Sequence, residues 1–322
     1  MNTLFTIEDD IFSLIPIEFN FILDQTDYTF GGFVFRKNML QRLIAYSNSC
    51  KLYCVWDFKN VELCDDRMFD VLSEEMLTNV IIININKTPR VSEQLINSLE
   101  KMRKQYDIED DTKEITFSAK AKQVLSALNA EGLYRNCISQ MVQKNTRKYD
   151  RQWNYLVSSG VYSNMLIDLK GMFYKHIDTM YIIYSLYNRI SEWGENFDYF
   201  AATSKNGVAL ATVLCELFQK DLICFNIGQM FEEIYNRKSI VEEGKRYVHI
   251  FDVICLGSEA KVVNALISAQ GGILEKSFGV VCLQNLEVIR EKNRYSFLNN
   301  VEPLITYDEV NLDYRISLTG KE

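Results

Sequence analysis

The segment "RYVHIFDVICLGSEAKVVNALISAQGG" (residues 246–272) carries three successive structural signals. Residues 247–251 form a short apolar run with the length of a buried strand. An acidic turn follows, and over residues 259–269 apolar side chains recur with the spacing of a helix. The segment therefore predicts a strand, a turn and a helix, an arrangement that often holds a phosphorylated ligand.

The turn in this segment contains residue types that suit a sugar phosphate. Gly257 lets a phosphate approach the backbone, and we expect Ser258 to cap the helix. Asp252, directly after the apolar run, is placed to accept hydrogen bonds from sugar hydroxyls. A strand that ends in an ordinary capped turn shows the same residues, so this turn alone does not distinguish a ligand site from a structural one.

The same alternation of strand and helix continues on both sides of the segment. "FDYFAATSKNGVALATVLCELF" (residues 197–218) predicts strand, loop and helix, and "DLICFNI", "FGVVCL" and "PLIT" predict further strands. Short and almost wholly apolar strands of this kind are typical of a parallel sheet with helices on both faces. Ligands of such sheets bind at the carboxyl ends of the strands.

Two more segments are candidates for that edge. "ATSKNG" (residues 202–207) precedes a helix, so its N–H groups and Lys205 suit an anion, although Ser, Asn and Gly are also ordinary turn residues. "SSGVYSNMLIDLKGMF" (residues 158–173) joins a Ser-Gly turn to an apolar run that Asp168 and Lys170 interrupt. This run is too irregular for a plain core strand.

In chain order, these three segments resemble the type I phosphoribosyltransferases, and among them the orotate phosphoribosyltransferases. The resemblance covers about residues 153–310, and no part of the chain before them. The family's Ser-Gly segment is matched by Ser159, Gly160, Ser163, Asp168 and Lys170. Its Ala-Thr loop is matched by Ala202, Thr203, Gly207, Leu210 and Ala211. Its phosphoribosyl pyrophosphate loop is matched by "FDVICLGS" (residues 251–258).

The resemblance implies a role for each matched position. If the chain is an active enzyme of this kind, Asp252 would hold ribose, Lys205 would hold an anionic leaving group, and Asp168 or Lys170 would orient the loop on the base side. The ligand-binding positions would be Gly257, Ser258, Cys255, Leu256, Thr203, Gly207, Ser159, Gly160 and Lys170. Magnesium would enter only together with phosphoribosyl pyrophosphate or a nucleotide. The resemblance also implies a homodimer, because the family's catalytic loop serves the neighbouring subunit.

The family's reactive groups are replaced at several of these positions. Phe251 stands where the family has its first acid, and Cys255 and Leu256 stand where it has two threonines. The span matching the catalytic loop, "NIGQMFEEIYNRKSIVEE" (residues 226–243), has acidic side chains where the family has cations. Since each charge-assisted hydrogen bond contributes about 1.5–3 kcal/mol, these losses together predict well over ~5 kcal/mol less stabilisation, and ordinary nucleotide synthesis is not expected.

Three functions remain compatible with this pattern. The first is a repurposed phosphoribosyltransferase-like protein that binds a nucleotide or phosphoribosyl ligand as a sensor or effector, for example in a bacterial anti-phage system of the retron type. The alternative is an active pentosyltransferase or a nucleotide-cleaving N-glycosidase of altered specificity. The third is a purely structural interaction protein with an empty site.

The sequence predicts an α/β architecture in three parts. Residues 1–110 form a smaller α/β domain of unknown role, with strands at 51–58 and 80–86 and helices at 66–77 and 92–106. Residues 111–152 form a connector of two helices, and residues 153–322 form the phosphoribosyltransferase-like parallel sheet. Residues 1–150 would be the part that docks a protein or ribonucleoprotein partner.

Composition limits the remaining classes of function. The formal net charge is -8 with a pI near 5.1, which argues against a broad nucleic-acid-binding surface. Most of the eight cysteines lie in apolar segments, and two histidines are too few for a zinc site, so we expect a reducing compartment and no structural metal. The start of the chain has no signal-peptide pattern, and no apolar run has membrane-spanning length, which predicts a cytoplasmic protein.

Overall fold

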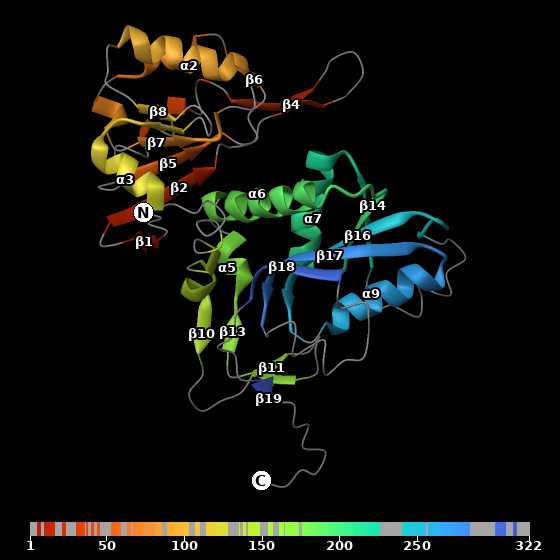
Figure 1. Cartoon of the computed structure of the whole chain (residues 1–322). Helices are drawn as coiled ribbons and strands as arrows, with labels where there is room; N and C mark the ends of the chain where they lie inside the picture. The colour runs from red at the N-terminus through yellow and green to blue at the C-terminus, as the bar shows by residue number, and fades with distance from the viewer. Residues whose placement is uncertain are drawn as a thin grey trace. The chain divides into compact units, whose positions relative to one another are not determined.

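The computed structural model describes most of the chain in separate stretches. They comprise residues 5–7, 10–16, 21–23, 30–35, 37, 40–41, 44–45, 53–58, 63–65, 67–73, 75–78, 80–85, 89–102, 107–109, 114–127, 135, 138–139, 141–148, 154–156, 161–163, 165–173, 176–225, 240–255, 257–283, 300–306 and 312–313. The chain divides into two compact units, Met1–Cys137 (unit 1) and Ile138–Glu322 (unit 2). Each unit has its own sheet, and each is described by itself below (Figure 1).

Unit 1 is built on a six-stranded mixed sheet. Its strands, in spatial order, are β1 (Phe5–Ile7), β2 (Asp10–Pro16), β5 (Tyr53–Asp57), β7 (Val80–Ile83), β9 (Glu114–Thr116) and β8 (Asp107–Glu109). Strands β2, β5 and β7 are parallel, and the outer pairs are antiparallel. A second sheet contains β3 (Phe21–Leu23), β4 (Phe30–Phe35) and β6 (Leu63–Cys64). Its described helices include η1 (Met68–Val71), η2 (Glu75–Leu77), α2 (Pro89–Lys101) and α3 (Ala119–Ala127).

The observed elements differ from the sequence expectations at three places, two in unit 1 and one near the start of unit 2. The predicted helix 66–77 is two short 3-10 turns, because Leu72 between them has an extended backbone with ψ 143°. Strands β8 and β9 pair as a hairpin, so residues 114–116 form a strand of the sheet, where two connector helices were the predicted elements. The second connector helix ends before β10 (Thr146–Lys148), because these residues pair with another strand instead.

Unit 2 contains the predicted parallel sheet. Its order is β15 (Asp221–Cys224), β14 (Tyr199–Ala202), β16 (Arg246–Ile254), β17 (Ile273–Cys282) and β18 (Val301–Thr306), and every neighbouring pair is parallel. The helices against it are α6 (His176–Trp193), α7 (Lys205–Phe218) and α9 (Ser258–Ala269). The fold class predicted from the sequence, a parallel α/β sheet flanked by helices, is therefore confirmed.

The helices cover both faces of this sheet. Phe200 of β14 packs edge-to-face on Phe218 of α7, whereas the next residue, Ala201, belongs to a cluster with Val263 and Leu266 of α9. Because successive strand residues point to opposite faces, α7 and α9 lie on opposite sides of the sheet, as Figure 1 shows. Helix α6 contacts α7 and β17 and therefore shares the α7 face.

Two small sheets and a short helix complete unit 2. Strand β10 pairs antiparallel with β13 (Met165–Ile167), and β12 (Val161–Ser163) pairs antiparallel with both β11 (Asn154–Leu156) and β19 (Leu312–Asp313). Helix α5 (Leu169–Phe173) follows β13 directly. The irregular segment 158–173 thus contains two short strands and a helical turn, rather than one core strand.

Strand β16 places neighbouring side chains on different faces with different surroundings. Phe251 is buried on the α9 side, in a cluster with Ile254, Ala260 and Val301. Its ring lies over Gly279, the residue paired with it on β17, and a Cβ at Gly279 would lie 1.9 Å from the ring. Position 251, where the family resemblance implies an acid, is therefore a core position whose space Gly279 provides.

We predict that Gly279→Ala destabilises the protein through this ring, by about 1–3 kcal/mol of overpacking. In a Phe251→Ala background the same change should cost less than half as much, because the clashing atoms are gone. Urea unfolding of the four proteins of this cycle measures both values.

Gly244→Ala serves as the control, since a Cβ at Gly244 meets no atom of the described residues within 4 Å and its φ of 75° is the strain that opposes the change. Its cost should be the same with and without Phe251. Equal costs of Gly279→Ala in both backgrounds would contradict the proposed packing.

Candidate functional site

The direction of the chain reverses between β14 and β16, which are adjacent and parallel. From β14 the chain passes through α7 to β15, on one side of the pair. From β16 it passes through α9 to β17, on the other side. The loops after β14 and β16 therefore leave the same edge of the sheet towards opposite faces, and ligands of open parallel sheets bind at such a switch point.

The loop after β14 is held in a defined conformation by Ser204. Its backbone is extended, and its Oγ accepts a 3.0 Å hydrogen bond from the Gly207 N–H, which caps α7. A Cβ at Gly207 would lie 2.8 Å from the Ile250 carbonyl oxygen. Gly207 thus allows the first turn of α7 to pack closely against β16, and this packing stabilises the position of the loop.

Asp252 connects this loop to β16. Its Oδ1 accepts a 3.1 Å hydrogen bond from Ser204 Oγ, and its Oδ2 accepts a 2.8 Å hydrogen bond from Asn206 Nδ2. The side chain is half-buried on the α7 face of the sheet. The acid that the sequence assigned to ribose is thus positioned at the switch point, and it orders the neighbouring loop.

Glu259, which was not among the residues predicted from the sequence, contacts the loop after β14 from the first turn of α9. Its carboxylate accepts hydrogen bonds from Thr203 Oγ1 and from the Ser204 N–H, and its side chain is 14% exposed. Burial opposes its ionisation, but the nearby His249 imidazole and these hydrogen bonds outweigh that effect and lower its pKa below the usual value. Glu259 is therefore a fixed negative charge beside the β14 loop.

His249 lies beneath Glu259 and is completely buried. Its Nδ1 lies 3.2 Å from Ser277 Oγ on β17, within hydrogen-bonding distance. Its Nε2 lies 3.7 Å from Glu259 Oε1, which is beyond that distance, and has no hydrogen-bond partner among the residues that the structure describes. One buried ring nitrogen therefore faces the carboxylate without a closed hydrogen bond.

The loop after β16 leads into α9 through a glycine. Gly257 has φ 73° and is the N-cap residue, and no side chain caps the helix. Ser258 is the first helical residue, so the expectation that it caps α9 was wrong: the left-handed glycine starts the helix one position earlier. Cys255 is buried, and Leu256 lies outside the described residues.

The other predicted site residues lie in α7, after β13, in α5 or outside the described residues. Lys205 is the first residue of α7 and is exposed. Asp168 follows β13, where its N–H donates to Asn145 O at 3.0 Å and its carbonyl accepts from the Gly171 N–H. Lys170 belongs to α5, and Ser159 and Gly160 lie outside the described residues. The structure thus brings Thr203, Lys205, Gly207, Asp252, Cys255, Gly257 and Ser258 to the two switch-point loops.

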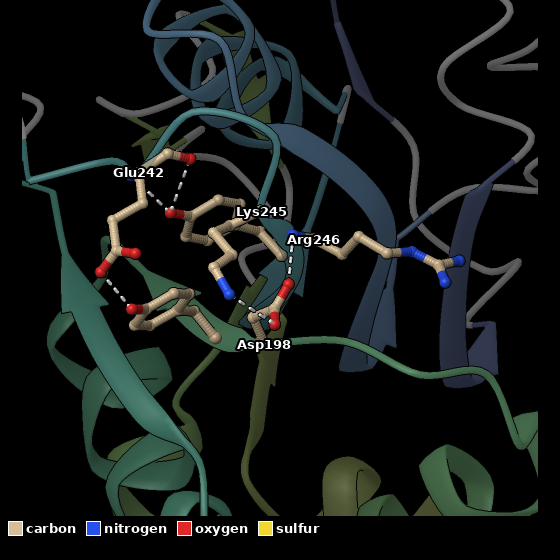
Figure 2. A network of polar contacts seen from close by, with 6 residues as sticks. Asp198, Glu242, Lys245 and Arg246 are labelled. Carbon is tan, nitrogen blue, oxygen red and sulfur yellow. Dashed lines mark hydrogen bonds and ion pairs between the residues drawn. The ribbon is translucent and has the colours of Figure 1, made fainter.

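A separate polar network lies at the amino ends of β14 and β16 (Figure 2). Asp198 accepts hydrogen bonds from the Arg246 N–H at 2.9 Å and from Lys245 Nζ at 3.3 Å. The Arg246 N–H is the main reason why the pKa of Asp198 is lowered. These contacts fix the first residue of β16 beside the entry to β14.

The same network holds the turn that precedes β16. Glu242 accepts a hydrogen bond from the Tyr199 hydroxyl, and its N–H donates to the Tyr247 hydroxyl oxygen at 2.8 Å. The hydrogen bond to Glu242 raises the pKa of Tyr199 to about 12. Residues 226–239, most of the span that the resemblance matches to the catalytic loop, lie outside the described residues. The described end of that span is held in the network by Glu242.

Two negative findings hold for the stretches of the chain that the structure describes. Within them, no group of three or more His, Cys, Asp or Glu side chains has the geometry of a metal site. No helix in those stretches is both long and apolar enough to cross a bilayer.

Comparison with known proteins gives similarity only at the level of structure. No protein-family model matches the chain, and no curated protein is significantly similar to it. Similar solved structures include adenine phosphoribosyltransferase from Leishmania tarentolae, with 14% identity, a TM-score of 0.41, and 52% of this chain and 87% of that chain covered. Adenine phosphoribosyltransferase from Thermoanaerobacter pseudethanolicus has 16% identity and a TM-score of 0.41, with 52% of this chain and 99% of that chain covered. Orotate phosphoribosyltransferase from Aeropyrum pernix has 14% identity and a TM-score of 0.40, with 52% of this chain and 93% of that chain covered. Similarity at this level carries no information on the ligand or activity of this chain.

We predict that Glu259 makes stability depend on pH in the acidic range. Because its pKa is lower in the folded protein, its contribution is complete above the unfolded value near 4.5 and is lost as the pH falls through the folded value. Glu259→Gln should therefore cost roughly 1–3 kcal/mol at neutral pH and progressively less in acid. Unfolding midpoints from about pH 7 to about pH 3 measure the difference.

The matched control is Glu216→Gln, on the exposed surface of α7, which should leave the pH profile unchanged. A constant difference between wild type and Glu259→Gln across the whole range would show that the Glu259 charge is not linked to folding.

Proposed function

We propose that unit 2 binds a nucleotide or phosphoribosyl compound at the switch-point loops and acts as a sensor or effector. The observation that carries this proposal is the bridge formed by Asp252, which joins the β14 loop to the end of β16. It supports a preformed site, because the polar groups of two loops are already ordered at one edge of the sheet. The sequence resemblance to type I phosphoribosyltransferases supplies the ligand class.

In the proposed complex the phosphate binds the amide groups at the start of α9. Gly257 brings the backbone of this loop into a left-handed conformation, and the first N–H groups of a helix are free to bind an anion. Asp252 then accepts hydrogen bonds from ribose hydroxyls with the part of its carboxylate that Ser204 and Asn206 leave accessible. Lys205, exposed at the first turn of α7, adds a positive charge near the ligand.

Two observations favour binding over phosphoribosyl transfer. Phe251 lies in the core beneath α9, so a second acid for the ribose is absent from that position. Glu259 adds a negative charge beside the β14 loop, where a departing pyrophosphate would need positive charge. Both features remove stabilisation from a transition state with an anionic leaving group.

The wider role rests on the resemblance alone. We propose a cytoplasmic homodimer in which the first 150 residues contact a protein or ribonucleoprotein partner, as in a bacterial anti-phage system of the retron type. Light scattering tests the dimer. Phage plating on cells with and without the protein tests the defence role, and equal plating would contradict it.

Calorimetric titration with ribose 5-phosphate and adenosine monophosphate tests the binding proposal. We expect wild type to bind at least one of them, and Asp252→Asn to weaken binding by roughly tenfold, because a charge-assisted hydrogen bond is lost. Gly257→Ala should weaken binding as well, since its Cβ disfavours the left-handed loop.

Asp221→Asn is the matched control, because Asp221 is exposed at the amino end of β15, away from the switch-point edge. It should bind like wild type. Failure of every phosphorylated probe to bind wild type would contradict the proposal. Mass spectrometry of the same mixtures completes the test, since cleavage or exchange of the nucleotide would support the enzymatic alternative instead.

A further inference from the structure

The donor groups of the β14 loop are already engaged by carboxylates of the chain itself. Glu259 accepts from the Thr203 hydroxyl and from the Ser204 N–H. Asp252 accepts from the Ser204 hydroxyl and from the Asn206 side-chain amide. Four donor groups of Thr203, Ser204 and Asn206 are thus directed to internal anions, whereas the Lys205 side chain is exposed.

The position of Glu259 is fixed by groups on three elements. It belongs to the first turn of α9, it contacts the loop between β14 and α7, and it lies 3.7 Å from His249 Nε2 on β16. His249 is completely buried, and in the described part of the chain this nitrogen has no hydrogen-bond partner. A buried donor or acceptor without a partner is costly. The Glu259 carboxylate supplies the only described polar contact of this nitrogen, and that contact favours its present position.

We propose that Glu259 determines ligand specificity as the resident anion of the β14 loop, so that the site accepts one phosphate at Gly257 and Ser258 and excludes a second phosphate group from residues 203–206. This inference rests on the proposed function and narrows its ligand class. The ligand would be a ribose monophosphate or nucleoside monophosphate, and not a compound with an additional pyrophosphate.

Charge and geometry both support the exclusion. A phosphate that entered the β14 loop would lie against the Glu259 carboxylate, and like charges repel strongly in a partly buried site. It would also have to displace the carboxylate from Thr203 and Ser204 to obtain their hydrogen bonds. The N–H groups at the start of α9 carry no such competitor among the described contacts, so one phosphate can bind there without displacing a side chain.

Two variants separate the charge of Glu259 from its volume. Glu259→Gln keeps the size and removes the charge, and Glu259→Ala removes both and exposes the donors of Thr203 and Ser204. Calorimetric titration with inorganic pyrophosphate should show at least roughly tenfold tighter binding to Glu259→Ala than to wild type, with Glu259→Gln between them. Glu216→Gln, an equal charge change on the exposed face of α7, should bind pyrophosphate like wild type.

Ribose 5-phosphate in parallel titrations distinguishes this inference from the proposed function. If wild type binds ribose 5-phosphate but neither folded Glu259 variant gains affinity for pyrophosphate, the inference is overturned and the binding function stands. Tight binding of pyrophosphate to wild type overturns the inference in the same way. If no protein binds ribose 5-phosphate, adenosine monophosphate or pyrophosphate, both proposals fail. Circular dichroism checks the fold of each variant, and Glu259→Gln decides the outcome if Glu259→Ala does not fold.

Discussion

The parallel pairing of β14 with β16 is the constraint on which the rest of unit 2 depends. It brings residues about fifty positions apart in the chain to the same edge of one sheet, with Tyr199 opposite Tyr247 and Ala201 opposite His249. Because the connections from these strands run in opposite directions, α7 and α9 begin on opposite faces and their first turns flank the same edge. The Asp198 and Glu242 contacts at the amino ends fix the start of the same pair.

The alternation of side chains along β16 then assigns a role to each residue of the strand. His249 and Phe251 point to the α9 face, where one meets Glu259 and the other fills the space over Gly279. Asp252 points to the α7 face, where it holds the β14 loop. A shift by one residue would bury the acid and expose the aromatic ring, so the register of the sheet maintains both the core and the site.

Much of this architecture follows from local sequence. Apolar runs of four to six residues, small turn residues and helical periodicity are visible without tertiary information, and they predict the strands of the parallel sheet and helices α7 and α9 in the right order. Other elements were harder to predict, because residues 66–77 of unit 1 have helical spacing but break at Leu72, and Arg147 and Lys148 of unit 2 are helix-compatible yet pair with β13. Pairing with a distant strand overrides local preference at such places.

The contacts that define the candidate site are the part that local sequence does not reveal. Glu259 and Thr203 are 56 positions apart, and their hydrogen bond exists only because β14 and β16 are adjacent. The replacement of an acid by Phe251 was visible in the sequence, but its burial depends on Gly279 of the neighbouring strand. A glutamate two residues after a turn glycine is a weak signal, because acids are common in the first turn of helices for reasons unrelated to ligands.

A crystal structure of the protein soaked with ribose 5-phosphate would show whether the switch point is a site for one phosphate. The account predicts a phosphate on the amide groups of Gly257 and Ser258, a ribose hydroxyl on Asp252, and Glu259 still bound to Thr203. A phosphate bound at residues 203–206 with Glu259 displaced, or no phosphate at either loop, would contradict it.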